Sequence, residues 1–178
     1  MKDGTTLQTR LGDFAVVQAT NDQARSVLEL RDDLATWMLD HDVEQWRPGE
    51  LTLEWIQTCV SEGWIYVVPH DQRVIASVTI VWNDPSMWGD LSDPAGYIHM
   101  LMVNRDFAGH RIGRALLAWA EHFIRDAGRS LARLDCVRSN VVLRGYYERV
   151  GYTLVGETAL PEVEWALEAA LYEKHLKP

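Results

Sequence analysis

Two groups of residues in the second half of the chain have types and a spacing that suit chemistry on a phosphate-bearing ligand. In the first group, an apolar run at residues 97–103 leads into a turn with Gly109 and then into an amphipathic helix predicted over 111–127. The first turn of a helix has N–H groups without intrahelical acceptors and lies at the positive end of the helix dipole, so it attracts anions. Gly109 and Gly113 allow the backbone to approach such a ligand closely.

Arg111 and Arg114 lie in the same turn and can add charge-assisted contacts to a phosphate group. Two other phosphate-binding signatures are absent: the chain has neither GxxxxGK[ST] nor GxGxxG, which argues against a P-loop and a Rossmann site. Taken alone, this first group is better explained as a glycine-tolerant turn before an ordinary amphipathic helix.

A second group of residues makes the functional interpretation of the first group more specific. Asn140 opens a predicted helix, and Tyr147-Glu148 and Gly151-Tyr152 follow at fixed intervals. Together the two groups make the segment 96–152 resemble the GNAT superfamily of acyl-CoA N-acyltransferases. In that family a strand leads to Q/R-x-x-G-x-G/A at a helix start, and N-(x)6-Y-E-x-x-G-[FY] follows. Near the end of the chain, the run ALYEK at residues 170–174 resembles the family's last strand.

The sequence departs from the family pattern in the glycine turn. The family's Arg or Gln position falls on Ala108 and its first glycine falls on Arg111, whereas Gly113 keeps the pattern. The family holds the pyrophosphate mainly through backbone N–H groups, so side-chain changes at these positions weaken the signature more than the site.

The resemblance implies acetyl-CoA as cosubstrate and assigns residues to each part of it. The backbone of Leu101, Met102 and Val103 would contact the pantetheine arm, with a bulge opening the space beside this strand. Asn140 would hydrogen-bond the same arm, and it can also act as the helix N-cap. The residues that would wrap the pyrophosphate are Gly109, His110, Arg111, Ile112, Gly113 and Arg114.

The resemblance also suggests the catalytic groups. Tyr147 would protonate the leaving thiolate as a general acid, although Leu143, Tyr147 and Val150 also share a helix face on which they could simply pack. Asp135 and His99 are the two candidates for the general base. Asp135 could instead form an ion pair with an arginine, and His99 could be a structural histidine. Many family members use no single dedicated base. The chain has no Cys or His spacing typical of a metal site, so we expect no metal.

The elements that position these residues form a mixed pattern. The order of strands and helices indicates a mixed α/β sheet rather than a doubly wound one. The resemblance implies a mostly antiparallel sheet of about seven strands with about four helices, splayed between the fourth and fifth strands. Composition favours a helix at 163–176, but its alternation and the ALYEK pattern favour a strand. Strands are predicted at 13–20, 64–68, 74–82, 97–103, 131–137 and 152–156, helices at 21–39, 52–63, 111–127 and 140–150, and a loop at 83–96.

Substrate selection is expected on the N-terminal side. Gln45, Trp46 and Glu54, with the loop 84–93, could form an acceptor pocket with aromatic walls and acidic charge. For Trp46 and Trp55, packing is the alternative. Tryptophans recur near every ninth residue without a wider repeat, at positions Trp37, Trp46, Trp55 and Trp64.

Composition and net charge limit the classes of partner that the protein is expected to bind. The net charge of −9 argues against nucleic acid and anionic membranes as partners. No apolar run approaches the roughly 20 residues needed to span a bilayer, and no signal peptide is recognisable at the N-terminus. Cys59 and Cys136 are expected to be reduced thiols in a cytoplasmic protein.

We therefore expect one N-acetyltransferase domain over residues 1–178 that acetylates a primary amine of a small molecule or a peptide by direct attack. A non-catalytic acyl-CoA-binding module is the main alternative, and a generic α/β nucleotide-binding protein is a weaker one. Dimers are common in the family, so a homodimer is one of the states to test.

Overall fold

A mixed seven-stranded sheet forms the centre of the computed structural model, which describes residues 6–160 and 168–177. The strand order is β3-β4-β5-β6-β7-β9-β8, and all neighbours are antiparallel except β6 and β7, which are parallel. This confirms the predicted mostly antiparallel sheet. The strands are β3 (Val17–Gln18), β4 (Ile65–His70), β5 (Arg73–Val81), β6 (Ala95–Val103), β7 (Leu131–Val137), β8 (Thr153–Ala159) and β9 (Glu168–His175).

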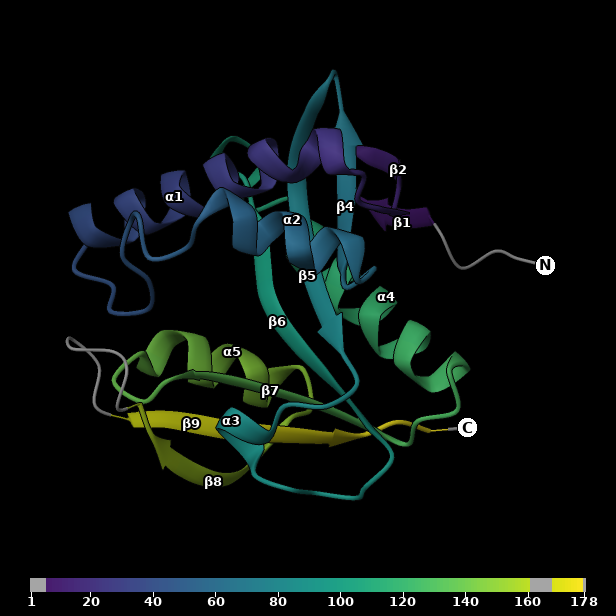
Figure 1. The fold of residues 1–178 in the computed structure, drawn as a ribbon, viewed down its shortest axis with the longest axis vertical. Coiled ribbons are helices and arrows are strands. Elements are labelled where there is room, and N and C mark those ends of the chain that lie inside the picture. The colour runs from purple at the N-terminus through teal and green to yellow at the C-terminus, as the bar shows by residue number, and fades with distance from the viewer. Residues whose placement is uncertain (1–5, 161–167, 178) are drawn as a thin grey trace.

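Helices cover both faces of the β4–β6 half of the sheet. Helices α1 (Ala24–Asp40) and α2 (Leu53–Ser61) pack together on one face, over a core that includes β4 and Met102. Helix α4 (Ile112–Asp126) packs against β5 and β6 within the other main core. Helix α5 (Val141–Arg149) lies with β7, β8 and β9 in the other half of the molecule (Figure 1). Strand β5 is buried from Val74 to Ile80 because both of its faces are covered.

The sheet splits between its fourth and fifth strands, β6 and β7, as predicted. The two strands pair only from Ala95 to Ile98 against Leu131 to Leu134, and then diverge (Figure 1). An extra residue in β6 accompanies the split: two residues separate His99 from Met102, whereas one separates their partners Thr79 and Ser77 on β5. Met100 there has a φ of +45°. Such a bulge bends a strand and breaks its pairing, so the last residues of β6 have no β7 neighbour.

Helix starts follow local capping signals. Thr52 precedes α2, and its hydroxyl accepts from the Trp55 N–H at 3.1 Å. The helix predicted over 21–39 begins with a 3-10 turn (Asn21–Gln23) that runs into α1. The Thr20 N–H donates to Gln23 Oε1 at 3.0 Å, which is half of a capping box.

Two predictions need correction. The predicted loop 83–96 contains a short helix, α3 (Pro85–Trp88), because Asp84 caps it and proline favours the first helical position. The predicted strand 13–20 is broken into β2 (Gly12–Ala15) and β3, and β2 pairs with an unpredicted strand, β1 (Thr6–Thr9). The strand predicted in the tail is confirmed where the structure describes it, in β9, and residues 163–167 lie outside the described residues.

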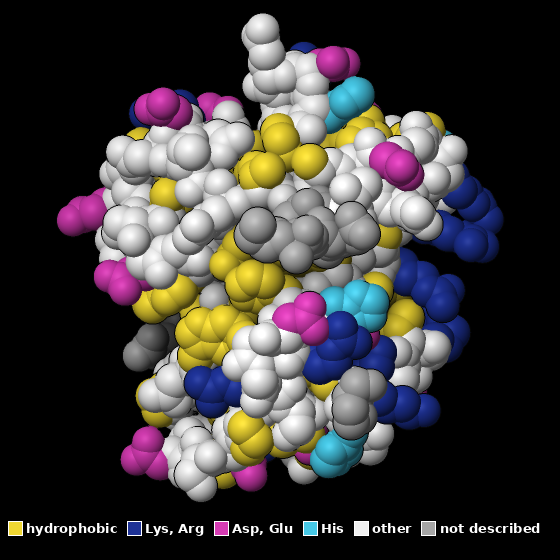
Figure 2. Space-filling view, turned by 90° about the vertical axis from the view of Figure 1, so that its right-hand side faces the viewer, with side chains coloured by type: hydrophobic (Ala, Val, Ile, Leu, Met, Phe, Trp, Pro, Cys, Tyr) yellow, Lys and Arg dark blue, Asp and Glu magenta, His cyan; other side chains and the backbone are white. Residues whose placement is uncertain are grey.

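Charge is distributed unevenly over the surface. On the face shown in Figure 2, Lys and Arg side chains gather towards the right and Asp and Glu side chains lie mostly towards the left. The net charge of −9 therefore coexists with a locally basic surface. Within residues 6–160 and 168–177, none of the helices has the length and apolar character needed to span a membrane.

Candidate functional site

A cavity of about 460 Å³ lies where β6 and β7 diverge. Its walls come mainly from β6, β7, α5, the start of α4, and α1 with the segment that follows it. The structure thus brings together residues from both sequence motifs. The predicted site residues that line this cavity are His99, Leu101, Val103, Gly113, Asp135 and Tyr147.

The turn before α4 has the backbone geometry expected of an anion site. Gly109 and Arg111 have φ values of +80° and +67°, so the chain reverses tightly before the helix begins at Ile112. A Cβ on Gly113 would lie only 3.3 Å from Val103 Cγ2, which shows how closely the helix start approaches β6. Arg111 is an unusual residue for this left-handed conformation, which favours glycine.

The side chains of the predicted pyrophosphate residues divide into two groups. Arg111 and Arg114 are exposed and free to extend towards a ligand, whereas Ile112 is buried in the core. The carbonyl of His110 accepts from the Arg10 N–H at 3.3 Å, which links the turn to the first hairpin. Met102 is also buried in the core rather than in the cavity, so Ile112 and Met102 can offer a ligand only their backbone.

Asn140 is the N-cap of α5, and its Oδ1 accepts from the Leu143 N–H at 3.1 Å. Its Nδ2 donates to Gln45 Oε1 at 3.3 Å, and the same oxygen accepts from the Val137 N–H at 3.2 Å. Asn140 lines an adjoining cavity of about 610 Å³, which shares Leu143 and Tyr146 with the first. Gln45, predicted for the acceptor side, therefore lies on the β7 side of the split and holds Asn140.

Tyr147 is buried, and its ring packs among other tyrosines. Its ring centroid lies 5.6 Å from that of Tyr146 and 6.0 Å from those of Tyr152 and Tyr172. Tyr147 therefore has the predicted packing role, and it also lines the cavity. Burial raises the pKa of the Tyr147 hydroxyl above its usual 10, so this group keeps its proton at neutral pH.

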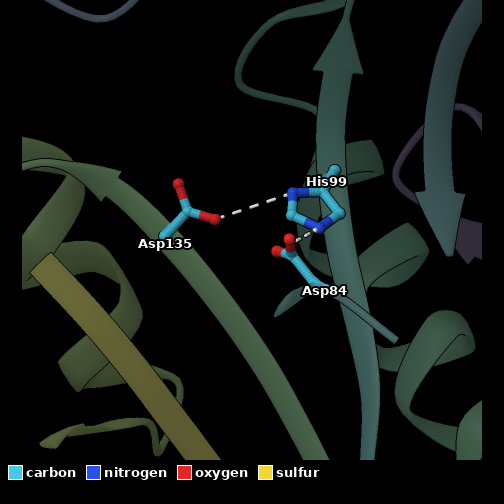
Figure 3. Close-up of side chains that lie close together, drawn as sticks. All are labelled: Asp84, His99 and Asp135. Atoms are coloured by element: carbon cyan, nitrogen blue, oxygen red, sulfur yellow. Dashed lines mark ion pairs between the residues drawn. The ribbon is translucent and has the colours of Figure 1, made fainter. Parts of the chain in front are cut away.

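His99 lies between two carboxylates (Figure 3). Its Nε2 is 3.2 Å from Asp84 Oδ2, and its Nδ1 is 3.6 Å from Asp135 Oδ1. Burial alone would lower the pKa of His99, but hydrogen bonding to Asp84 and the charges of both carboxylates outweigh burial, and the pKa rises above 6.5. The three side chains form one coupled titrating group.

The two carboxylates respond differently to this arrangement. Burial is the main cause that raises the pKa of Asp135 above 3.8, although the charge of His99 opposes it. Burial would also raise the pKa of Asp84, but the hydrogen bond and charge of His99, with contacts from Ser86 and the Met87 N–H, lower it. Asp135 Oδ1 is buried without a hydrogen-bond partner among the described residues, so it can accept one from a ligand or water.

The same three side chains have donor atoms within 4.8 Å of one another, which is also a spacing for metal ligands. The imidazole ring, however, stands between the carboxylates, and each carboxylate faces a different ring nitrogen (Figure 3). A metal ion needs its ligands to converge on one point. The arrangement suits proton transfer through the ring better than chelation.

A second cavity, of about 490 Å³, lies on the other side of His99. His99, Met100 and Trp46 line both cavities. Of the predicted acceptor residues, Trp46 and the start of the loop 84–93 line the second cavity. Glu54 is exposed at the start of α2 and does not contribute to either wall.

Sequence reasoning missed the contact between Asp84 and His99. The sequence predicts Asp84 only as the first residue of the acceptor loop 84–93. The run Asp84-Pro85-Ser86 does signal a helix cap, and Asp84 accepts from Ser86 Oγ at 2.8 Å and from the Met87 N–H at 3.4 Å. That signal predicts the turn, but it does not predict that the turn brings the carboxylate to His99.

Known proteins resemble this chain over most of its length. The sequence model of the acetyltransferase (GNAT) family matches residues 14–152. The N-acetyltransferase YesJ of Bacillus subtilis (strain 168) is 32% identical over 155 residues, which cover 82% of this chain and 85% of YesJ.

Solved structures share the fold. A GNAT-family acetyltransferase from Listeria monocytogenes superposes with a TM-score of 0.79 at 23% identity, over 96% of this chain and 99% of that one. The Microcin C7 self immunity acetyltransferase MccE, in complex with acetyl-CoA and AMP, gives a TM-score of 0.66 at 14% identity, over 91% and 92% of the two chains. The chain belongs to the GNAT family of acetyltransferases and is an acetyl-CoA-dependent acetyltransferase.

Proposed function

We propose that this enzyme transfers the acetyl group of acetyl-CoA to a primary amine of a small molecule or a peptide, by direct attack. The observation that supports this most strongly is the position of His99 at the junction of two cavities, with a carboxylate at each ring nitrogen. One cavity lies along the diverging strand and the other is open to a second substrate. An acetyl donor and an amine would meet at this junction.

The residues along β6 and α4 fit acetyl-CoA. Leu101 and Val103 belong to the part of β6 that has no β7 partner, so that edge is available to the amides of a pantetheine arm. The start of α4 offers N–H groups to a pyrophosphate, and Gly113 keeps the approach clear of a side chain. Asn140 would contact the same arm if its Nδ2 exchanged Gln45 for the ligand. When bound, acetyl-CoA supplies a thioester whose acetyl carbon accepts the amine and whose sulfur leaves as a thiolate.

We propose His99 as the general base that removes the proton of the acceptor amine, directly or through a water molecule. Asp84 holds one ring nitrogen, and Asp135 stabilises the imidazolium from the other side. Because the pKa of His99 is raised above 6.5, its neutral form becomes the major form only at a pH above 6.5. Asp135 is the alternative base, supported by its raised pKa and by its buried Oδ1, which faces His99 but has no hydrogen bond among the described residues.

Tyr147 is proposed as the general acid for the thiolate. Its raised pKa keeps the hydroxyl protonated at neutral pH, and it lines the same cavity as His99. The base and the acid are therefore separate groups, on β6 and α5, and positioning of the two substrates between them supplies much of the rate.

We also propose a cytoplasmic location and a single domain over residues 1–178. A homodimer remains a prediction from the family resemblance. Cys59 and Cys136 support the location, because both are buried free thiols, as expected in a reducing compartment. Fractionation of cells that express a tagged full chain tests the location, and sedimentation of the purified protein tests the oligomeric state.

The activity is tested by incubating the protein with acetyl-CoA and a panel of amines while free CoA thiol is measured with a disulfide reagent. The protein's own thiols should not interfere, because burial raises the pKa of Cys59 to about 11 and that of Cys136 to about 12. We expect amine-dependent thiol release and a product whose mass rises by one acetyl group. Bound acetyl-CoA without thiol release for any amine would contradict the proposal.

A further inference from the structure

The walls of the second cavity are mostly apolar and aromatic. Three tryptophans contribute to it from different parts of the chain: Trp46 from the loop after α1, Trp55 from α2 and Trp64 from the residue before β4. Trp55 is 44% exposed, although most tryptophans are largely buried. The other apolar side chains that line the cavity are Leu51, Cys59, Val81, Pro85, Met87 and Met100.

Charge among the described lining residues is confined to two places, and each charged side chain there already has a partner of opposite charge. Asp84 is the one carboxylate among the described lining residues, and it is paired with His99. Arg31 lines the cavity with a buried guanidinium that donates to Glu50 and lies 3.2 Å from Asp32. Moving a second ammonium group of the acceptor from water into this cavity would cost desolvation free energy. No unpaired carboxylate among the described lining residues is available to offset that cost.

On the basis of the proposed function, we infer that the acceptor is a monoamine with a flat aromatic or apolar body. The amine would reach His99 and Asp84, and the body would lie between Trp46, Trp55 and Trp64. Aromatic walls favour such a body by stacking and by removing apolar surface from water. A cavity of about 490 Å³ is of the size that holds one small molecule of this kind.

The test compares four amines as acceptors at saturating acetyl-CoA: 2-phenylethylamine, tryptamine, ethanolamine and spermidine. We expect kcat/KM for the two aromatic amines to exceed that for ethanolamine and spermidine by about tenfold or more, because a filled apolar pocket discriminates by that order. Equal or higher kcat/KM for spermidine or ethanolamine would overturn the inference.

A matched pair of variants locates the effect. Trp55→Ala should lower kcat/KM for 2-phenylethylamine by about fivefold to tenfold, should lower it much less for ethanolamine, and should leave the KM for acetyl-CoA unchanged. Trp82→Ala is the control, because Trp82 is similarly exposed, at 37%, but packs against Phe123 outside this cavity. Equal losses for both variants, or none for Trp55→Ala, would contradict the assignment.

The outcomes separate this inference from the proposed function. Thiol release with spermidine or a peptide, but not with the aromatic amines, would contradict this inference and leave the proposed function intact. If no amine is acetylated, calorimetric titration of 2-phenylethylamine into the wild type and Trp55→Ala still tests the cavity. Binding that is weakened in Trp55→Ala would support the inference, and no binding to either protein would overturn it.

Discussion

The two cavities beside His99 are built in different ways. The cavity along the diverging strands is shaped mainly by backbone: the bulge at Met100, the positive φ of Gly109 and Arg111, and the close approach of Gly113 to β6. The second cavity is shaped by side chains, with tryptophans from three segments and Asp84 from α3's cap. A backbone site can be shared across a family with little sequence identity, whereas a side-chain site can differ in each member.

The largest expected effect is at the junction itself. His99→Gln should lower kcat by roughly 10²- to 10⁴-fold, because the proposed base is lost, while calorimetry should show unchanged acetyl-CoA binding. His122→Gln, which changes an exposed histidine on α4, is the matched control and should keep full activity. If His99→Gln keeps most of its activity and Asp135→Asn does not, the base is Asp135.

Removal of the proposed acid should have the next largest effect. Tyr147→Phe keeps the ring that packs against Tyr152 and Tyr172, so thermal unfolding should change little. We expect kcat to fall by about a hundredfold, near the lower end for general acid catalysis. Tyr146→Phe is the neighbouring control and should lose much less. An unchanged kcat in Tyr147→Phe would leave this tyrosine with a packing role only.

A side chain at the start of α4 should affect the cofactor side alone. Gly113→Val would place a Cβ about 3.3 Å from Val103 Cγ2 and extend methyl groups into the cavity. We expect the KM for acetyl-CoA to rise about tenfold, or about 1.4 kcal/mol, with little change in the KM for the amine. Gly156→Val, in β8, is the control, because a Cβ at Gly156 meets only Leu171 Cδ1, at 3.9 Å. Similar effects from both variants would refute a specific role for Gly113.

The smallest expected effect is a displacement of the pH profile. The pKa of His99 is raised, so kcat/KM should increase with pH and level off only above pH 6.5. Asp84→Asn removes a group that raises this pKa, and the rising limb should therefore move to lower pH. The comparison uses kcat/KM from pH 5 to 9, with Asp90→Asn, an exposed acid near α3, as control. A limb that moves to higher pH in Asp84→Asn would contradict the assignment.

The sequence predicted the backbone-built side of the site better than the side-chain-built side. The glycine turn and Asn140 are local patterns, and the split between β6 and β7 follows once the fold is known. The link from Gln45 to the Val137 N–H spans 92 positions, and no local pattern indicates it. Asp84 reaches His99 because α3 turns the chain back, and that short helix lay in a segment predicted as loop.

The tryptophan spacing illustrates the same limit. The near-regular interval of nine residues had no evident meaning in the sequence. In the fold, Trp46, Trp55 and Trp64 line one cavity, whereas Trp37 stacks under Arg105, 3.8 Å from the guanidinium carbon to the ring centroid. Which tryptophans converge depends on how α1, α2 and β4 pack, and the interval alone does not encode that packing.

The most direct test of the account is a crystal structure of the enzyme with CoA and 2-phenylethylamine bound together. We expect the CoA sulfur to face Tyr147 along β6. We also expect the amine nitrogen about 2.6–3.2 Å from a ring nitrogen of His99 or from a water bound to it, with the phenyl ring between Trp46 and Trp55. An amine bound away from His99, or CoA bound outside the split between β6 and β7, would contradict this account.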